Sequence, residues 1–195
     1  MSRRSARIAS FVALWIAWAA PALSTPPVET VIGDASHAQW TPYGSGKASN
    51  TRVPDLPGGV ALRLKVRQKG AQPWDAGLSV QLKEGVQAGE RVIAGVYARA
   101  HTPAPGRETA AVIARVQQNG QPYDAVIEAS FEIGPEWRFH CVQGPARRSF
   151  GAGSLELGLQ LAGEQQTVEV GPFMVVRGGE GERTMLPCDT RITAG

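Results

Sequence analysis

The segment from Gly95 to His101 alternates between small apolar and large polar side chains. Ala98 and Ala100 belong to the first set, whereas Tyr97 and Arg99 belong to the second. Successive side chains of a β-strand point to opposite faces of a sheet, so the two sets lie on opposite faces. The alternation predicts that Tyr97 and Arg99 face solvent, where an aromatic ring and a guanidinium can contact a ligand.

Neighbouring segments repeat this division into an apolar row and a polar row. Leu78, Val80 and Leu82 leave Gln81 on the opposite face, and the leucines of 155–161 leave Gln160 opposite. The polar row of 111–117 is expected to complete the same surface. We therefore predict one outer face formed by Gln81, Tyr97, Arg99, Arg115, Gln117 and Gln160. Solubility alone is normally served by Lys, Glu and Thr, so this mixture indicates a binding surface.

Sugars require this mixture of side chains. A glutamine amide both donates and accepts hydrogen bonds, arginine offers a rigid fork of donors, and an aromatic ring packs against the C–H face of a pyranose. Trp74, in the turn 72–77, is a candidate aromatic wall at the edge of such a cleft, with capping of the core as its structural alternative. Tyr123 lies in a second such turn, and we expect its ring to pack there. Arg99 and Arg115 have the alternative of pairing with acidic neighbours.

The elements that position these residues are short strands. The predicted strands span 60–66, 77–82, 91–100, 109–117, 125–133, 136–142, 154–161 and 167–176, and Gly, Pro and Asn mark the turns between them. No helix of three turns is evident. Many strands without interleaved helices predict an all-β fold, an antiparallel β-sandwich of the jelly-roll kind.

The composition favours one domain and argues against a nucleic-acid partner. The chain has 195 residues, of which 43% are hydrophobic and 19% charged, with 23 Gly and 14 Pro. These values are typical of a single turn-rich domain with a substantial core. The formal charge of +3 comes from Arg3, Arg4 and Arg7, because 20 − 3 leaves 17 basic side chains to balance the 17 acidic ones. A neutral chain lacks the field for non-specific phosphate binding.

The N-terminus has the three-part layout of a secretory signal. Three arginines precede an apolar run from Ile8 to Ala20, and small residues follow it around Ala22. We predict a signal peptide at 1–24, a β-sandwich domain at 25–179 and a C-terminal tail at 180–195. The protein is then secreted or periplasmic, with no membrane span after cleavage; an uncleaved anchor is the alternative.

An exported chain with two cysteines favours a disulfide over a metal site or a nucleophile. Cys141 and Cys188 are expected to pair and to pin the tail to the domain, with two free thiols as the alternative. The alternation around Cys141 places His140 on the opposite face and assigns Trp137 and Phe139 to the core.

Catalytic motifs are absent from the sequence. It has no Gly-x-Ser-x-Gly elbow and no His-Glu-x-x-His zinc pair. A glycosidase needs two carboxylates across a cleft, and the predicted face offers amides and cations instead. The enzymatic alternative is a polysaccharide lyase in which Tyr97, Arg99 and His101 neutralise a uronate and move its proton. A further alternative is an envelope domain that binds a protein partner and no sugar.

The order of several short motifs resembles the carbohydrate-binding modules of the family 4, 9 and 22 group. The matching pieces are 72–77, 88–90 leading into 97–100, 135–137, 157–160 and 168–172, and together they span about residues 55–177. The resemblance implies a galactose-binding-like β-jelly roll and a polysaccharide or oligosaccharide ligand. It also implies the cleft residues Gln81, Tyr97, Arg99, Gln117 and Gln160, with Trp74 near the edge.

The resemblance also bears on whether the protein binds a structural metal and acts with a partner enzyme. Such modules often hold a structural calcium through an acidic residue near the first strand and an Asp near the last, where this chain has Asp34 and Glu169. The departure at Glu169 argues against calcium, and we expect no cofactor. Because these modules usually accompany glycoside hydrolases, a separate hydrolase is an expected partner of a non-catalytic binding domain.

Overall fold

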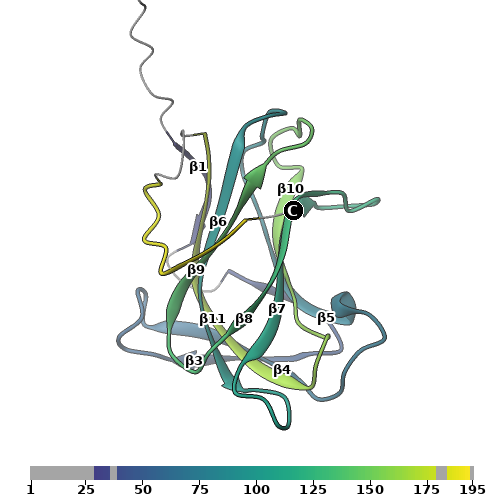
Figure 1. The fold of residues 1–195 in the computed structure, drawn as a ribbon, viewed down its shortest axis with the longest axis vertical. Coiled ribbons are helices and arrows are strands. Elements are labelled where there is room, and N and C mark those ends of the chain that lie inside the picture. Colours follow the sequence, from purple (N-terminus) through teal and green to yellow (C-terminus); the bar gives the residue numbers. More distant parts are fainter. Residues whose placement is uncertain (1–28, 36–38, 179–183, 194–195) are drawn as a thin grey trace, which may run out of the picture.

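The fold is a sandwich of two β-sheets (Figure 1). The structure is a computed structural model, and it describes residues 29–35, 39–178 and 184–193. In Figure 1, β1, β6, β9 and β11 lie on the left, and β5, β7 and β10 lie on the right. The predicted signal peptide lies outside the described residues. Within the described part of the chain, no helix has the length and apolar character needed to cross a membrane.

The seven-stranded sheet has the order β12-β9-β6-β11-β4-β3, with β1 also paired to β11. Its neighbours are antiparallel except for β12, which runs parallel to β9. Its strands are β1 (Thr30–Ala35), β3 (Lys47–Arg52), β4 (Val60–Val66), β6 (Arg91–Thr102), β9 (Arg138–Pro145), β11 (Gln166–Arg177) and β12 (Thr190–Thr193).

The five-stranded sheet has the order β2-β5-β10-β7-β8, and all its neighbours are antiparallel. Its strands are β2 (Thr41–Gly44), β5 (Ala76–Gln81), β7 (Ala110–Gln118), β8 (Ala125–Ile133) and β10 (Leu155–Gln160). A short 3-10 helix, η1 (Pro73–Asp75), leads into β5.

The core lies between the sheets and is built from the apolar rows that alternation predicts. Leu62, Leu64 and Val66 of β4 face the leucines of β10 and the apolar row of β5 across the sandwich. Trp40 closes the core near Phe173, and its indole Nε1 donates to the carbonyl of Gly171 at 3.0 Å. The predicted all-β sandwich is confirmed.

Four strands were not predicted because their sequences carry no period-two apolar signal. The clearest case is β3, Lys-Ala-Ser-Asn-Thr-Arg, whose residues are almost all exposed. Pairing with β4 holds it in place, for example Ser49 opposite Arg63. An exposed polar strand of this kind forms at a sheet edge, where only one neighbour is needed.

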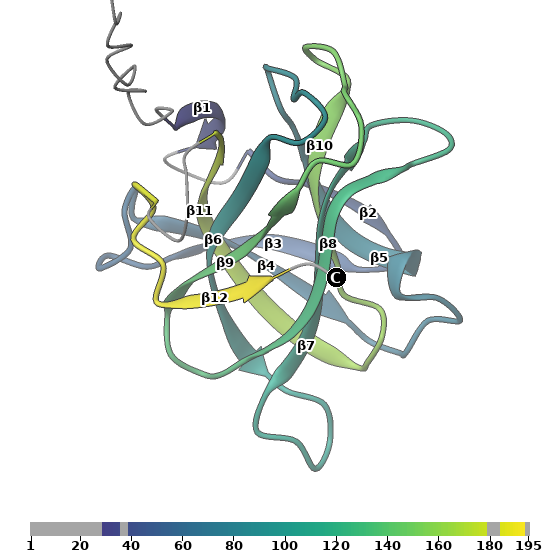
Figure 2. The same cartoon turned by 45° about the horizontal axis from the view of Figure 1, so that its top comes forward.

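The described part of the predicted tail packs against the outer face of the seven-stranded sheet. Cys188 forms a disulfide with Cys141 across a sequence separation of 47 residues. Leu186 is buried beside Ile93 and Val176, and β12 extends the sheet beyond β9 (Figure 2). Residues 184–193 are therefore part of the domain.

Phe139 belongs to this outer cluster and not to the core between the sheets. Its ring contacts Tyr97 edge to face, with centroids 4.8 Å apart, and Leu186 joins the same cluster. The prediction of a core position was wrong because the C-terminal segment buries this outer face, which a single strand's alternation cannot reveal. Trp137 also lies outside the core, half-buried under the guanidinium of Arg99.

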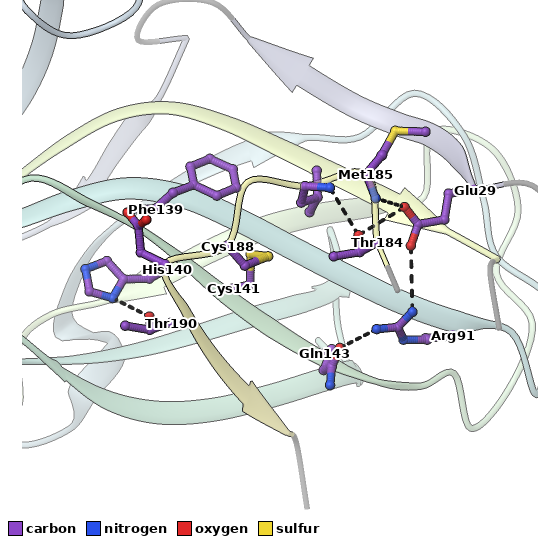
Figure 3. The surroundings of a disulfide bond; sticks show 12 residues. Glu29, Arg91, Phe139, His140, Cys141, Gln143, Thr184, Met185, Cys188 and Thr190 are labelled. Carbon is purple, nitrogen blue, oxygen red and sulfur yellow. Dashed lines mark hydrogen bonds and ion pairs between the residues drawn. A yellow bond between two sulfur atoms is a disulfide. The ribbon is translucent and has the colours of Figure 1, made fainter. Parts of the chain in front are cut away.

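Glu29 fastens the start of the described chain to the same segment (Figure 3). Its carboxylate accepts hydrogen bonds from the hydroxyl of Thr184 at 3.0 Å and the backbone N–H of Met185 at 2.6 Å. The guanidinium of Arg91 lies 3.7 Å from its other oxygen. Both ends of the described chain are thus joined on one side of the sandwich.

Candidate functional site

The outer face of the five-stranded sheet carries three cross-strand rows of polar and small residues. Each row crosses β5, β10 and β7: Gly77 with Gln160 and Ile113, Ser79 with Gly158 and Arg115, and Gln81 with Glu156 and Gln117. Adjacent strands lie about 4.8 Å apart, so the rows form one continuous surface. The face brings together four of the predicted residues, Gln81, Arg115, Gln117 and Gln160.

Glycine occupies the centre of this face. A Cβ added to Gly158 would meet no heavy atom closer than 3.9 Å, so only ordinary van der Waals contacts surround this position. On one side, the phenol of Tyr43 lies over Gly77, where a Cβ would collide with it. Arg115 stands on the other side, directly opposite Gly158. Gly158 thus lies on the sheet face between an aromatic ring and a guanidinium, and we call this strip of the face the groove.

Tyr43 is held as a neutral hydrogen-bond donor at this groove. Its hydroxyl reaches the carbonyl of Leu159 at 3.5 Å, and its ring is half-buried. Burial and then the nearby Glu156 carboxylate raise the pKa of Tyr43 to about 12, although Arg115 acts in the opposite direction. The phenol therefore keeps its proton at any physiological pH.

The nitrogen and the oxygen of the Gln117 side-chain amide differ in their hydrogen bonding. Its Nε2 donates to Glu156 Oε1 at 2.6 Å, whereas its Oε1 is buried without a hydrogen-bond partner among the described residues. A buried amide oxygen without a donor is costly. The oxygen itself has almost no exposed surface, so the amide must turn outward before a ligand hydroxyl can bond to it.

Arg115 is positioned by two neighbours. Its Nε lies 2.7 Å from Glu128 Oε2, without the alignment of a good hydrogen bond, and its Nη2 donates to the carbonyl of Tyr123 at 3.2 Å. These contacts hold the guanidinium at the rim of the groove. The alternative of an acidic partner is thus realised, and it is compatible with a ligand role because Glu128 is half exposed.

Gln160 and Gln81 take different positions on the face. Gln160 is buried and lines a hollow of about 260 Å³ together with Ile113, Ser130 and Pro73. Gln81 is exposed, and its Nε2 donates to the carbonyl of Gly153 at 2.9 Å. Gln160 therefore lies within a hollow of the face, and Gln81 contacts the loop at its margin.

Two exposed aromatic residues lie beyond opposite ends of the strands. Trp74, 54% exposed, precedes β5, whereas Tyr123, 47% exposed, follows β7. β5 and β7 run in the same direction because both are antiparallel to β10. The exposure of Trp74 does not agree with the alternative of a core cap, and the exposure of Tyr123 leaves nearly half of that residue accessible to solvent.

Tyr97 and Arg99 do not belong to this face, which corrects the prediction of a common surface. β6 pairs with β9 and β11 in the seven-stranded sheet, so both side chains point outward on the opposite wall of the sandwich. Tyr97 packs on Phe139, and Arg99 binds Glu169. The lyase candidates, which include His101, share this opposite wall.

Three functional candidates escaped the sequence analysis. Tyr43 lies in β2, a short strand without an alternating pattern. Glu156 has the same strand phase as Gln160, and Glu128 alternates with Ile127 and Ala129, so their positions were available from alternation. The expectation of a face without carboxylates was therefore wrong.

The residues that the family resemblance offers for calcium do not fit a calcium site. The carboxylate of Glu169 accepts hydrogen bonds from Arg63 and Arg99, so its lone pairs and its charge are already engaged. Asp34 lies on β1, where it pairs with Met174. Among the described residues, no group of three or more His, Cys, Asp or Glu side chains could hold a metal ion.

The fold is a β-sandwich, and the outer face of its five-stranded sheet gathers polar, aromatic and small residues. The carbohydrate binding domain family CBM_4_9 matches residues 33–139, which is more than half of the chain. The chain belongs to this family of carbohydrate-binding domains. No curated protein matches the sequence.

Solved structures of the same fold come from carbohydrate-active proteins. The second N-terminal cellulose-binding domain of Cellulomonas fimi β-1,4-glucanase C superposes with a TM-score of 0.55 at 18% identity, covering 73% of this chain and 87% of that chain. A CBM4 structure gives 0.52 at 20% identity, covering 72% and 94%. An arabinose-bound GH51 α-L-arabinofuranosidase gives 0.55 at 18% identity, covering 72% of this chain but only 23% of that one. These likenesses confirm the predicted fold.

Proposed function

We propose that this protein is a secreted, non-catalytic domain that binds a neutral polysaccharide along the groove of the five-stranded sheet. The observation that carries the proposal is the position of Gly158 between Tyr43 and Arg115. It supplies an aromatic ring, a fork of donors and the partnerless oxygen of Gln117 within one surface. Family membership supports a carbohydrate as the ligand.

The charges of the groove favour an uncharged glycan. The outer face of the five-stranded sheet carries the carboxylates of Glu128, Glu132 and Glu156. Arg115 pairs with Glu128 and Arg107 with Glu132, so Glu156 is the one of these three without an ion pair among the described residues. An acidic polymer would be repelled by this excess of negative charge. Sugar hydroxyls, in contrast, can donate to carboxylates and to the oxygen of Gln117.

The absence of catalysis in the proposal rests on how the carboxylates are engaged. Glu156 accepts from Gln117, Glu128 contacts Arg115, and Glu132 accepts from Arg107 and Thr109. A glycosidase would need two carboxyl groups free to act across the bound bond. Incubation with neutral glycans should therefore release no new reducing ends.

Affinity electrophoresis against hydroxyethylcellulose, xylan and mixed-linkage β-glucan tests the proposal. At least one glycan should retard the protein, and Tyr43→Ala or Gln117→Ala should weaken that binding by about tenfold, because each removes a contact worth roughly 1.4 kcal/mol. Lys65→Gln is the matched control, because Lys65 is exposed on the opposite wall. Failure of every neutral glycan to bind, or equal effects in all three variants, would refute the groove.

The resemblance and the structural neighbours also support a partner. A Clostridium thermocellum structure of a CBM22-1 module joined to a GH10 module in complex with xylohexaose superposes with a TM-score of 0.52 at 11% identity, covering 78% of this chain and 30% of that one. We expect this chain to act beside a glycoside hydrolase. Added protein should then raise the rate at which such an enzyme degrades an insoluble form of the bound glycan.

A further inference from the structure

The outer face of the seven-stranded sheet has a cationic region that the groove does not use. One cross-strand row consists of Ser49, Arg63, Glu169 and Arg99, and the next contains Lys47, Lys65 and Thr167. We call Lys47, Arg63, Lys65 and Arg99 the cationic face. It lies on β3, β4 and β6, with Glu169 of β11 between the arginines.

A buried carboxylate fixes the two guanidinium groups of the cationic face. Glu169 has no exposed side-chain area, and it accepts from Arg63 Nε at 2.8 Å and from Arg99 Nε at 2.6 Å. Arg99 also stacks on Trp137, with 5.0 Å between the guanidinium carbon and the ring centroid. One carboxylate cannot neutralise two guanidinium groups, so the pair keeps a net positive charge and a fixed orientation.

Arg99 retains donors for a ligand. Only its Nε is bonded to Glu169, so its two terminal nitrogens have no hydrogen-bond partner among the described residues. The side chain is 31% exposed, which leaves these donors accessible. A guanidinium fork matches the two oxygens of a carboxylate.

The two lysines of the cationic face form a like-charged pair. Lys47 lies directly opposite Lys65 in the antiparallel ladder, and both are exposed. Neither has an ion-pair partner among the described residues. Like charges directly opposite each other destabilise a sheet. The outward positions of these strands carry Glu169 as their only described carboxylate, and it is buried, so the strands themselves place no exposed carboxylate beside the lysines.

We infer that the cationic face is a second binding surface, for the carboxylates of an acidic, uronate-containing polysaccharide. This inference goes beyond the proposed groove function, because the two surfaces lie on opposite walls and have opposite charge. The four strands β3, β4, β11 and β6 span roughly 14 Å at three spacings of about 4.8 Å, which suits an extended chain. A membrane is a poorer fit because the exposed large apolar side chains of the described residues, Val31, Trp74, Tyr123 and Met185, all lie elsewhere.

Polygalacturonate and its fully methyl-esterified form are matched probes for this inference. They share one backbone, and only the first is charged. At low ionic strength the protein should bind polygalacturonate, and added salt should weaken the complex because exposed charges are screened. The methyl ester should not bind to the cationic face.

A comparison of Lys47→Glu with Lys83→Glu distinguishes binding at the cationic face from an effect of the protein's net charge. Both replacements change the net charge equally at exposed lysines, but Lys83 follows β5 on the other sheet. Lys47→Glu should weaken polygalacturonate binding by about tenfold, and Lys83→Glu should change it by less than about twofold. Neutral-glycan binding should be unchanged in Lys47→Glu, which keeps this test independent of the groove.

Four outcomes would overturn the inference. They are no polygalacturonate binding at low ionic strength, equal binding of the methyl ester, equal losses in the two variants, and binding to mixed phosphatidylcholine and phosphatidylserine vesicles without binding to polygalacturonate. Thermal unfolding of each variant verifies that the protein is folded. Lys65→Glu provides a second variant on the same ladder pair, and it should lose binding to a similar extent.

Discussion

The two outer faces of the sandwich differ in charge, in the size of their central side chains and in whether another segment packs on them. The face of the five-stranded sheet combines Glu128, Glu132 and Glu156 with Arg115 and the small residue Gly158, whereas the cationic face of the seven-stranded sheet places four cations around the buried carboxylate of Glu169. Part of the second face is also covered by the C-terminal segment through Leu186 and Cys188. A chain with a formal net charge of +3 thus presents two outer faces of different charge.

The ion pairs on the two faces show how burial changes the role of the same chemistry. Glu169 has no exposed side-chain area and forms ion pairs with two arginines, whereas the side chain of Glu128 is 51% exposed and pairs with one. A buried carboxylate is a structural centre, because removing it leaves charges without compensation. An exposed pair contributes little to stability and remains available to a ligand.

The largest expected effect comes from removing the disulfide that exists on one face only. Cys188→Ser opens a link between residues 47 apart in sequence. The free energy of unfolding should fall by about 4 kcal/mol on the chain-entropy account. Urea unfolding measures the change, and neutral-glycan binding should persist under conditions where the variant is folded. Loss of glycan binding by the folded variant would mean that the two faces are not independent.

A smaller effect is expected from removing the carboxylate between the arginines. Glu169→Gln should lower the free energy of unfolding by about 2 kcal/mol, less than for a fully buried pair because both guanidinium groups are about one-third exposed. The matched variant on the other face, Glu128→Gln, should cost less than about 1 kcal/mol. Equal costs in chemical denaturation would contradict the difference in role.

The pH dependence of stability gives a separate test of the same residue. Burial raises the pKa of Glu169, whereas hydrogen bonds from Arg63 and Arg99 and the charges of these arginines lower it. The lowering effects together are larger, so the pKa lies below the ordinary value of 4.5. Its contribution to stability is therefore complete above pH 4.5 and is lost as the pH falls through the folded-state pKa. Glu169→Gln should flatten the acid limb of a stability profile, and an unchanged limb would show that other carboxylates control it.

The smallest expected effect has the opposite sign. Lys47→Glu replaces a like-charged cross-strand pair with an attractive one, so the melting temperature should rise by about 1–3 °C. A gain in stability together with a loss of polygalacturonate binding would show that the lysine pair is retained for binding at the expense of stability. Differential scanning calorimetry measures the shift, and a lower melting temperature would contradict the proposed repulsion.

Much of the fold could be predicted from the sequence because burial is periodic in a strand. β8 has the predicted bounds, and β4 through β11 match the predicted segments to within a few residues. The edge strands β2 and β3 could not be predicted, since an exposed strand with one neighbour needs no apolar row. The prediction that Phe139 lies in the core was wrong for a related reason, because a distant segment of the chain buries it on the outer face.

The candidate site was predicted in part. Alternation placed Gln81, Arg115, Gln117 and Gln160 outward, and the structure gathers them on one face. Tyr97 and Arg99 are also outward, but on the other wall. Tyr43 could not be found, because its place beside Gly77 depends on the pairing of β2 with β5.

The sequence by itself determined which side chains point outward, because the two-residue period of a strand is a local property. Only the tertiary structure decided which wall each outward side chain joins. Arg99 and Arg115 have equivalent local patterns, yet β6 pairs with β11 and β9 whereas β7 pairs with β10 and β8. Sheet membership depends on hydrogen bonding between distant segments, and this long-range pairing places Arg115 beside Glu128 on one wall and Arg99 beside Glu169 on the other.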